Sequence, residues 1–249
     1  MYKKKNKNSE QKIIIFSGAG ISAPSGISTF RDSNGLWENH NIDQICNEYT
    51  WKKHFSLVHD FYNQRRIQLK ETKPTEGHFL VKKLQEKYKE NIINLTQNVD
   101  NLFEMAGVEN TIHLHGFLPK MECEACGNKW EIGNVKFDIE KDRCPKCNSL
   151  KGVRPNIVFF NGQAPMYKKM YNALDYLYNP NSIIVVIGTM GNVILINDLI
   201  KSLPCKKILC NMEKSKYINE NIFDKVYYES ISTASDKIFN NIQQYLEKN

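Results

Sequence analysis

The chain has 249 residues, of which 41% are hydrophobic and 24% charged, and this balance predicts one large globular domain carrying a smaller insert. The formal net charge is +7, and four of the lysines that contribute to it lie in a polar stretch at residues 1–11. This stretch is predicted to be a disordered, solvated tail, so the positive charge does not indicate a nucleic-acid surface. No secretory signal pattern opens the sequence, and its longest apolar run, Ile183–Ile187, is far too short to cross a bilayer, so we expect a cytoplasmic protein without a membrane partner.

The first predicted element is a buried strand that begins near Lys12 and ends at a glycine turn. The turn, Gly18–Ala23, fits the pattern G-x-G-x-x-G/A, in which the first glycine permits a tight turn and the second lets the backbone approach a pyrophosphate. Backbone N–H groups beyond the turn would then face an anion, and a tight turn without a ligand is the alternative. The next residues, Pro24, Ser25 and Gly26, prevent an ordinary long helix from following.

A helical insert is predicted over residues 32–75. Apolar residues recur there at helical spacing, at Phe55, Val58, Phe61 and Tyr62. A further helix is predicted to open with the sequence Thr-Glu-Gly-His at residues 75–78. Its expected apolar face consists of Phe79, Leu80 and Leu84.

The rest of the chain alternates apolar strands with helical stretches. The predicted strands cover residues 91–96, 111–114, 156–160, 183–187, 207–210 and 225–228, and a helix through Leu102, Phe103 and Met105 ends at Gly107. This alternation predicts an α/β fold, a doubly wound parallel Rossmann-like sheet whose ligand site lies at the carboxyl ends of the strands. The sheet would be built from residues 12–31, 76–117 and 153–249, with strand 156–160 resuming it after a second insert.

Two C-x-x-C pairs, separated by seventeen residues, lie in this second insert, which is predicted over residues 118–152. Their spacing is typical of a four-cysteine zinc ribbon with the ligands Cys123, Cys126, Cys144 and Cys147. Four sulfur ligands leave no open position for water, so the zinc would be structural. The odd total of seven cysteines favours a metal site with free thiols over a disulfide framework, and redox dithiols are the alternative.

The glycine turn and several later segments together resemble the sirtuin family. From Gly18 to Arg31 the chain matches the sirtuin signature G-A-G-I-S-x-x-S-G-I-P-x-F-R except for Ser28 at the proline position. Residues 96–102, TQNVDNL, resemble the sirtuin segment T-Q-N-x-D-x-L. A histidine, His115, directly precedes a glycine, as the catalytic histidine of sirtuins does.

The C-terminal half continues the resemblance over nearly the whole remaining chain. Gly188–Met190 is similar to the sirtuin turn G-T-S, with a methionine in place of the last hydroxyl donor, and Asn211–Glu213 is similar to the turn N-x-E. Residues 157–162 resemble the substrate-pairing segment V-x-F-G-E, although the chain departs from it after Phe160. Backbone pairing with a peptide would tolerate that departure.

The resemblance implies an NAD-dependent protein-lysine deacylase, with NAD as co-substrate, one structural zinc and acylated-lysine proteins as partners. His115 would be the general base that activates ribose hydroxyls, so that the acyl group passes to ADP-ribose after nicotinamide has left, and His113 would be structural. An imidazole titrates near neutral pH and suits this role. The residues implied to bind NAD are Gly18, Ala19, Gly20, Ile21, Ser22, Phe30, Arg31, Gln97, Asn98, Val99, Asp100, Gly188, Thr189, Met190, Asn211, Met212, Glu213 and Ile231.

Substrate recognition is implied at two places. Val158, Phe159 and Phe160 would pair with the substrate peptide as a strand. Tyr62 and Arg65 match the Y-x-x-R pair of sirtuins that prefer acidic acyl groups, and Arg65 can form a bidentate pair with a distal carboxylate. The alternative for this helix is an amphipathic surface with an exposed Arg-Arg pair. Cys46, at a position usually occupied by alanine in that class, would tighten the pocket.

The sequence thus predicts a monomeric deacylase that removes succinyl, malonyl and acetyl groups from lysine. Two alternatives use the same cofactor. One is mono-ADP-ribosyl transfer from the same site, and the other is a sensor of NAD or ADP-ribose without turnover. Intact His115, Asn98 and Asp100 argue against the sensor.

Overall fold

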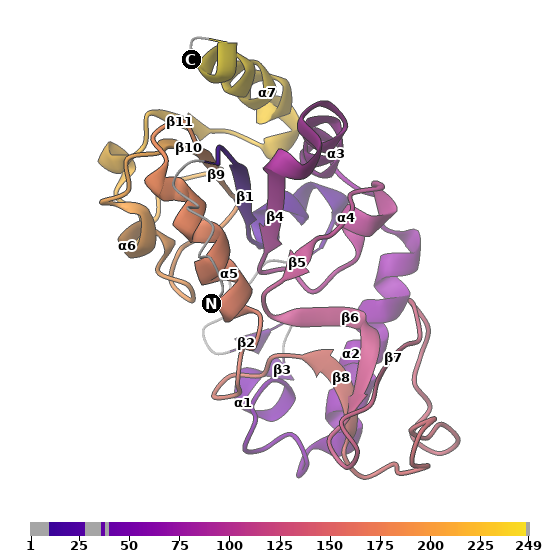
Figure 1. The fold of residues 1–249 in the computed structure, drawn as a ribbon. Helices are drawn as coiled ribbons and strands as arrows, with labels where there is room; N and C mark the ends of the chain where they lie inside the picture. The colour runs from indigo at the N-terminus through magenta and orange to yellow at the C-terminus, as the bar shows by residue number, and fades with distance from the viewer. Residues whose placement is uncertain (1–9, 28–35, 38–39, 248–249) are drawn as a thin grey trace, which may run out of the picture.

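Six parallel strands form the central sheet of the computed structural model, which describes residues 10–27, 36–37 and 40–247 (Figure 1). From one edge to the other they lie in the order β11 (Lys225–Tyr228), β10 (Lys206–Asn211), β9 (Ile183–Ile187), β1 (Ile13–Ser17), β4 (Ile92–Thr96) and β5 (Ile112–His113). The chain starts in the middle with β1, adds β4 and β5 on one side and later adds β9, β10 and β11 on the other. The predicted doubly wound parallel sheet is confirmed, and its order reverses between β1 and β9.

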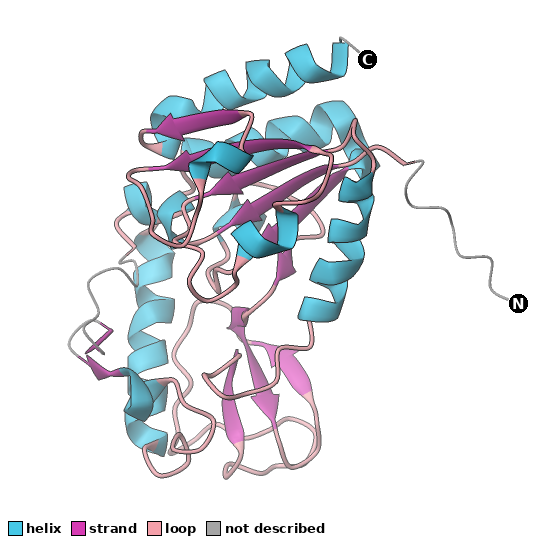
Figure 2. Ribbon diagram, turned by 90° about the vertical axis from the view of Figure 1, so that its left-hand side faces the viewer, coloured by secondary structure: helices cyan, strands magenta, loops and turns pink. Residues whose placement is uncertain are grey.

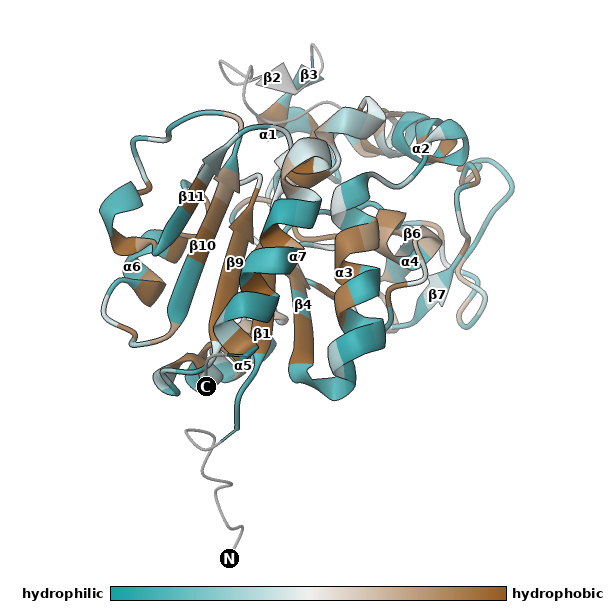
Figure 3. Ribbon diagram, turned by 90° about the horizontal axis from the view of Figure 1, so that it is seen from above, coloured by the Kyte–Doolittle hydropathy of each residue, from teal (hydrophilic) through white to brown (hydrophobic). Residues whose placement is uncertain are grey.

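Helices cover both faces of this sheet. One face carries α3 (Glu76–Tyr88), α4 (Leu102–Met105) and α7 (Ile231–Glu247), and the other carries α5 (Tyr167–Leu174) and α6 (Ile196–Ile200). All five residues of β1 are buried, with Ile13 and Ile15 in the core of the first face and Ile14 and Phe16 in that of the second. Figure 3 shows β1, β4 and β9 as predominantly hydrophobic strands, as a sheet covered on both faces requires.

Helix α3 begins where the sequence predicts. The Thr75 hydroxyl accepts a hydrogen bond from the Gly77 N–H (3.2 Å), and His78 Nδ1 accepts one from the Thr75 N–H (3.0 Å), which closes a capping box. The predicted apolar face is wrong at Phe79, which is 45% exposed. The buried positions are Leu80, Val81 and Leu84, because these share the side of the helix that faces the sheet.

A smaller module lies at one end of the central sheet (Figure 2). Its three-stranded antiparallel sheet has the order β7 (Lys129–Glu131), β6 (Gly116–Cys123), β8 (Val153–Ile157). Beside it lie the helices α1 (Ile42–Ile45) and α2 (Phe55–Glu71), and the short strands β2 (Leu36–Trp37) and β3 (His40–Asn41) pair with each other. Trp51, Val58 and Tyr62 pack in one core with Leu118 and Phe159, so the two inserts form one structural unit.

The expectation that a strand at 156–160 resumes the central sheet is wrong. The strand in this region is β8, which begins three residues earlier and pairs antiparallel with β6. A central strand of the parallel sheet needs an uninterrupted apolar run such as β9, whereas β8 carries Arg154 and Asn156. Residues 153–157 are therefore a strand of the small sheet.

The predicted N-terminal tail lies mostly outside the described residues. Gln11, at its end, donates a hydrogen bond from Nε2 to the Asn181 carbonyl (2.8 Å). None of the helices in the described part of the chain has both the length and the hydropathy of a membrane span.

Candidate active site

Two glycine turns pack against each other at the carboxyl ends of β1 and β9. The Gly20 N–H donates to the Gly188 carbonyl (2.8 Å), and a Cβ built on Gly20 would lie 2.5 Å from Gly188 Cα. A Cβ on Gly18 would lie 2.8 Å from the Gly188 carbonyl oxygen, so side chains are excluded at this contact. The chain continues through two short 3₁₀ helices, Ala19–Ile21 and Ala23–Ser25, and the predicted absence of an ordinary long helix is confirmed.

A buried polar cluster lies directly beyond the first glycine turn. The Ser22 hydroxyl donates to Asp100 Oδ2 (3.0 Å) and accepts from Asn98 Nδ2 (3.0 Å). Burial raises the pKa of Asp100, and hydrogen bonds from the Leu102 N–H and Ser22 oppose that shift. His78 Nε2 lies 3.5 Å from the same hydroxyl, and burial lowers the pKa of His78 to about 3. The cluster thus brings together three residues that were predicted to bind NAD. His78 joins them, and its only sequence signal was its place in the predicted start of a helix.

His115 lies in the two-residue link between β5 of the central sheet and β6 of the small sheet. Its Nδ1 lies 3.1 Å from the Gln97 carbonyl, which can only accept, so Nδ1 is the protonated nitrogen of the neutral ring. Nε2 is then the basic nitrogen, and the Tyr167 hydroxyl lies 2.9 Å from it. Burial lowers the pKa of His115, and the hydrogen bond to Gln97 opposes this shift. A neutral, partly buried imidazole of this kind can accept a proton at Nε2.

The neighbouring His113 has both ring nitrogens engaged by the protein. Its Nδ1 donates to the Asn98 carbonyl (2.8 Å), and its Nε2 lies 3.0 Å from Glu104 Oε1. These contacts fit the structural role predicted for His113, since they fix the backbone of the segment that carries Asn98.

A second predicted cluster lies at the end of β9. Asn211 accepts a hydrogen bond at Oδ1 from the Thr189 N–H (3.1 Å) and donates from Nδ2 to the Thr189 carbonyl (3.0 Å). Gln97 Nε2 donates to Thr189 Oγ1 (3.0 Å), so this turn is linked to the residue whose carbonyl contacts His115. Side-chain hydrogen bonds from Gln97 and Asn211 therefore hold this turn in place.

The other residues expected to bind NAD differ in their surroundings. Met212 and Glu213 are exposed, Ala19 and Val99 are half-buried, and Ile21 is fully buried. The Met190 carbonyl accepts a hydrogen bond from Ser215 Oγ (2.6 Å). Ile231 is only 4% exposed and packs in the core at the start of α7, so its contact with NAD stays a prediction. Ser28, Phe30 and Arg31 lie outside the described residues.

The residues predicted to select the acyl group lie on or beside α2. Tyr62 is fully buried, with its ring stacked on Phe159 at a centroid distance of 6.0 Å. The buried Cys46 contacts Tyr62, and burial raises the pKa of the Cys46 thiol while the hydrogen bond with Tyr62 opposes that shift. Arg65 is half-buried, and its guanidinium carbon lies 5.3 Å from the centroid of the Phe61 ring.

The alternative of an exposed Arg-Arg pair on α2 is wrong for Arg66. Its side chain is fully buried, and its guanidinium donates to the Leu118 carbonyl (2.9 Å) and to Asn63 Oδ1 (3.0 Å). Arg66 thus joins α2 to the small sheet, whereas Arg65, at the preceding position, keeps part of its surface accessible.

The segment predicted to pair with a peptide lies between the link that carries His115 and the helical insert. The Val158 N–H donates to the His115 carbonyl (2.8 Å), and the Phe160 N–H donates to the Cys46 carbonyl (2.9 Å). Phe159 points into the shared core, whereas Phe160 is 42% exposed. Residues 158–160 therefore connect the histidine to the residues that surround Tyr62.

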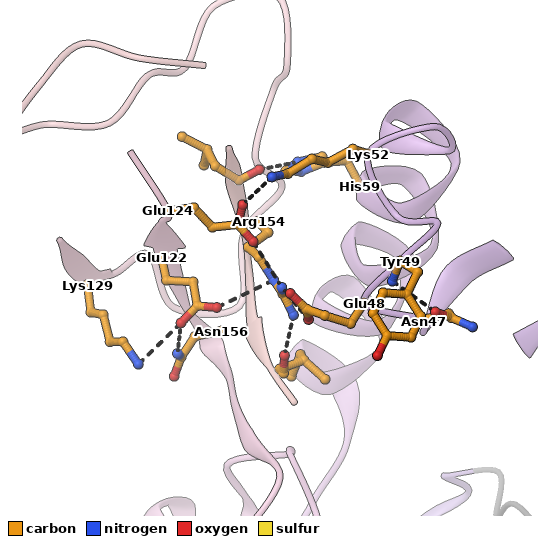
Figure 4. A network of polar contacts seen from close by, with 12 residues as sticks. Asn47, Glu48, Tyr49, Lys52, His59, Glu122, Glu124, Lys129, Arg154 and Asn156 are labelled. Atoms are coloured by element: carbon orange, nitrogen blue, oxygen red, sulfur yellow. Dashed lines mark hydrogen bonds and ion pairs between the residues drawn. The ribbon is translucent and has the colours of Figure 1, made fainter. Parts of the chain in front are cut away.

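Arg154 holds this region together and was not identified from the sequence (Figure 4). Its side chain is 4% exposed, and Nη1 contacts Glu48 Oε2 (2.8 Å) of the helical insert and Glu124 Oε1 (3.2 Å) of the small module. Nη2 donates to the Ile157 carbonyl (2.9 Å), and the guanidinium carbon lies 3.9 Å from the centroid of the Phe159 ring. A single buried cation thus joins the two inserts beneath the segment at 158–160.

We expect Arg154→Met to lower the free energy of unfolding by about 2 kcal/mol or more, because it leaves three carboxylates, those of Glu48, Glu122 and Glu124, without their shared cation and removes the partner of a buried carbonyl. The carboxylates retain some solvent contact, which keeps the loss at the lower end of the range for buried ion pairs. Lys52→Met is the matched control, since Lys52 also pairs with Glu124 (2.7 Å) but is 67% exposed. Urea unfolding curves compare the two, and equal effects would contradict the bridging role of Arg154.

The four cysteines of the predicted ribbon lie together. Their Sγ atoms all lie within 4.8 Å of one another, with 3.7 Å between Cys123 and Cys147 and 3.6 Å between Cys126 and Cys144. A tetrahedral zinc ion with Zn–S bonds of about 2.3 Å separates its sulfur ligands by about 3.8 Å. The cluster therefore suits one structural zinc, and no other group of potential metal ligands occurs among the described histidine, cysteine and acidic residues.

Comparison with known proteins defines the class of this fold and site. The model of the Sir2 family matches residues 18–194. The chain is 41% identical over 237 residues to an NAD-dependent protein deacylase of Campylobacter jejuni (strain RM1221), covering 95% of this chain and 98% of the relative. It is 37% identical to an NAD-dependent protein deacylase of Helicobacter hepaticus, covering 94% of this chain and 98% of the relative. The chain belongs to the Sir2 family, the sirtuins.

Solved structures agree with this assignment. A Sir2 homologue mutant in complex with ADP-ribose superposes with a TM-score of 0.81 at 26% identity, covering 100% of this chain and 99% of that one. A Sir2 homologue in complex with NAD gives a TM-score of 0.80 at 27% identity, covering 97% of this chain and 93% of that one. The sirtuin fold predicted from the sequence is confirmed.

Proposed function

We propose that this protein removes acyl groups from lysine side chains of proteins and consumes NAD in doing so. The observation that carries the proposal is His115, whose Nδ1 donates to the Gln97 carbonyl and whose Nε2 is thereby left as a base. Gln97 directly precedes Asn98, which donates to Ser22 in the polar cluster with Asp100. Membership of the Sir2 family and relatives described as NAD-dependent protein deacylases support the same reaction. In the proposal the enzyme acts as a monomer in the cytoplasm, as the sequence suggests.

The residues present fit a dinucleotide at this edge of the sheet. Gly20 and Gly188 pack so closely that the turn carries no side chain where a pyrophosphate would approach. The order of the strands also reverses here, between β1 and β9. Asn98 and Asp100 would hold the nicotinamide carboxamide and its ribose, and Thr189 and Asn211 would hold the adenosine end. Bound NAD would supply an activated ribose carbon that takes up the acyl oxygen as nicotinamide leaves.

The protein's own part in the reaction is positioning and proton transfer. His115 Nε2 would take the proton of a ribose hydroxyl, and the Gln97 carbonyl would stabilise the imidazolium through Nδ1. The segment at 158–160 would align the substrate peptide through the backbone groups that its contacts with His115 and Cys46 leave available. The four-cysteine cluster would contribute to folding and not to the chemical step, since four sulfur ligands saturate a tetrahedral zinc ion.

For the acyl group we propose succinyl and malonyl in addition to acetyl. Tyr62 and Arg65 lie on one helix three residues apart, and burial lowers the pKa of Arg65, so this cation has lost part of its hydration. A carboxylate that pairs with it would offset that loss, whereas acetyl would not.

We expect Arg65→Met to lower kcat/KM for a succinyl-lysine peptide by about tenfold to a hundredfold and to leave acetyl activity nearly unchanged. Methionine keeps the apolar stem on α2 and removes only the charge, so the acetyl peptide is an internal control. If both activities fall by the same factor, Arg65 has a structural role and the acidic preference is wrong.

The overall proposal is tested by measuring nicotinamide release with acetyl, succinyl and malonyl versions of one peptide. Release that depends on both NAD and the acyl group supports deacylation. Transfer of adenine-labelled material to protein without loss of the acyl group would instead establish mono-ADP-ribosyl transfer. Tight NAD binding without release from any peptide would establish the sensor.

A further inference from the structure

The Tyr167 hydroxyl occupies the nitrogen of His115 that the proposed reaction needs. Nδ1 of this ring donates to Gln97, so Nε2 carries the single lone pair of the neutral imidazole. The Tyr167 hydroxyl, 2.9 Å from Nε2, must therefore donate its proton to that lone pair. A ribose hydroxyl that is to give its proton to Nε2 needs the same lone pair, and the two donors exclude each other.

Tyr167 is held in this place by the start of a helix. It is the first residue of α5, its N–H donates to the Ala164 carbonyl (3.0 Å), and the body of the helix is anchored in the core through Met170, Ala173 and Leu174. Its ring centroid lies 5.9 Å from that of His115. The backbone that carries Tyr167 is thus fixed, and the hydroxyl reaches the histidine from the start of an anchored helix.

We propose that Tyr167 caps the catalytic base in the resting enzyme and that the NAD ribose must displace it before proton transfer. The inference rests on the proposed function, because it takes His115 as the base. Tyr167 acts through His115, so it is a positioning residue that sets how readily the base is reached.

The size of the effect follows from the hydrogen bond that has to be broken. A net hydrogen bond of ordinary strength corresponds to about a two- to tenfold change in an equilibrium or rate constant. Tyr167→Phe keeps the ring and removes the competing donor, so kcat/KM for NAD should rise by about two- to tenfold. The donated proton also stabilises the neutral imidazole, so the same change should raise the pKa of His115.

The test compares the full-length protein with its Tyr167→Phe variant and with Tyr171→Phe as matched control. Tyr171 lies one turn further along α5 and is 51% exposed, so it loses the same group away from the base. Two measurements are made on each protein. One is nicotinamide release at varied NAD with an acetyl-lysine peptide, and the other is titration of the His115 ring by NMR without ligands.

The proposal predicts faster release and a higher His115 pKa in Tyr167→Phe, with neither change in Tyr171→Phe. Slower release in Tyr167→Phe would overturn it and make the hydroxyl part of the reaction, and an unchanged pKa would show that no cap exists in solution. If the unmodified protein releases no nicotinamide, the proposed function fails, whereas the titration still decides whether Tyr167 occupies Nε2.

Discussion

Replacing His115 with alanine should lower the steady-state formation of deacylated peptide by about 10²- to 10⁴-fold, the usual contribution of a general base. Binding of NAD should change little, because the imidazole acts on a proton and the glycine turns, Asn98 and Asp100 remain in place. Steady-state kinetics with an acetyl-lysine peptide and calorimetric NAD binding measure the two effects separately. Turnover at the level of the unmodified protein would remove His115 from the mechanism.

His113→Ala is the control for loss of an imidazole from the same segment. His113 contacts the Asn98 carbonyl and Glu104, so its loss should mainly lower stability.

The pH profile of the unmodified enzyme gives a second check. Because burial lowers the pKa of His115, the base is neutral at pH 7, and kcat/KM should stay level there and fall only as the pH drops below the ordinary range of histidine.

The second large effect is expected at the four-cysteine cluster. Cys144→Ser removes one of four sulfur ligands, and structural zinc sites contribute apparent binding free energies of about 10–16 kcal/mol in small zinc-finger peptides. That is as large as the whole stability of an ordinary domain, about 5–15 kcal/mol. We therefore expect the variant to lose its zinc and to melt well below the unmodified protein, as followed by metal analysis and circular dichroism.

Cys205→Ala is the matched variant, because Cys205 is also buried but lies outside the cluster, in the core of the central sheet. It should keep the full zinc content and most of the thermal stability. If Cys144→Ser keeps the melting temperature and activity of the unmodified protein, the ribbon holds no structural metal.

The central sheet could be predicted because its strands carry their own signal. β1 and β9 are apolar at nearly every position and are directly followed by glycines, a pattern typical of strands that are covered on both faces in a parallel sheet. The zinc ligands, Ser22, Asn98 and Asp100 could each be named because each lies in a short motif of fixed spacing, whereas the contacts that join Ser22 to Asn98 and Asp100, over 76 and 78 positions, were not predicted. Contacts within such motifs are set by local geometry.

Contacts between distant segments gave no such signal. Arg154 meets Glu48 over 106 positions, and Tyr167 meets His115 over 52. The partners of these residues depend on how distant segments pack together, and no local sequence pattern predicts that packing. The error at β8 has the same origin, because its partner β6 was expected to lie in a separate insert. Phe79 was misplaced because a small shift in the helical phase moves a side chain from core to surface.

If His115 is the base, as we propose, its place between β5 and β6 makes activity depend on the integrity of two sheets at once. Its ring is fixed through Gln97 beside the central sheet, and its carbonyl is fixed by Val158 beside the small sheet. Local opening of either sheet would move the base without unfolding the other. On heating, activity should therefore disappear when the less stable of the two sheets opens, and that sheet would set the working limit of the enzyme.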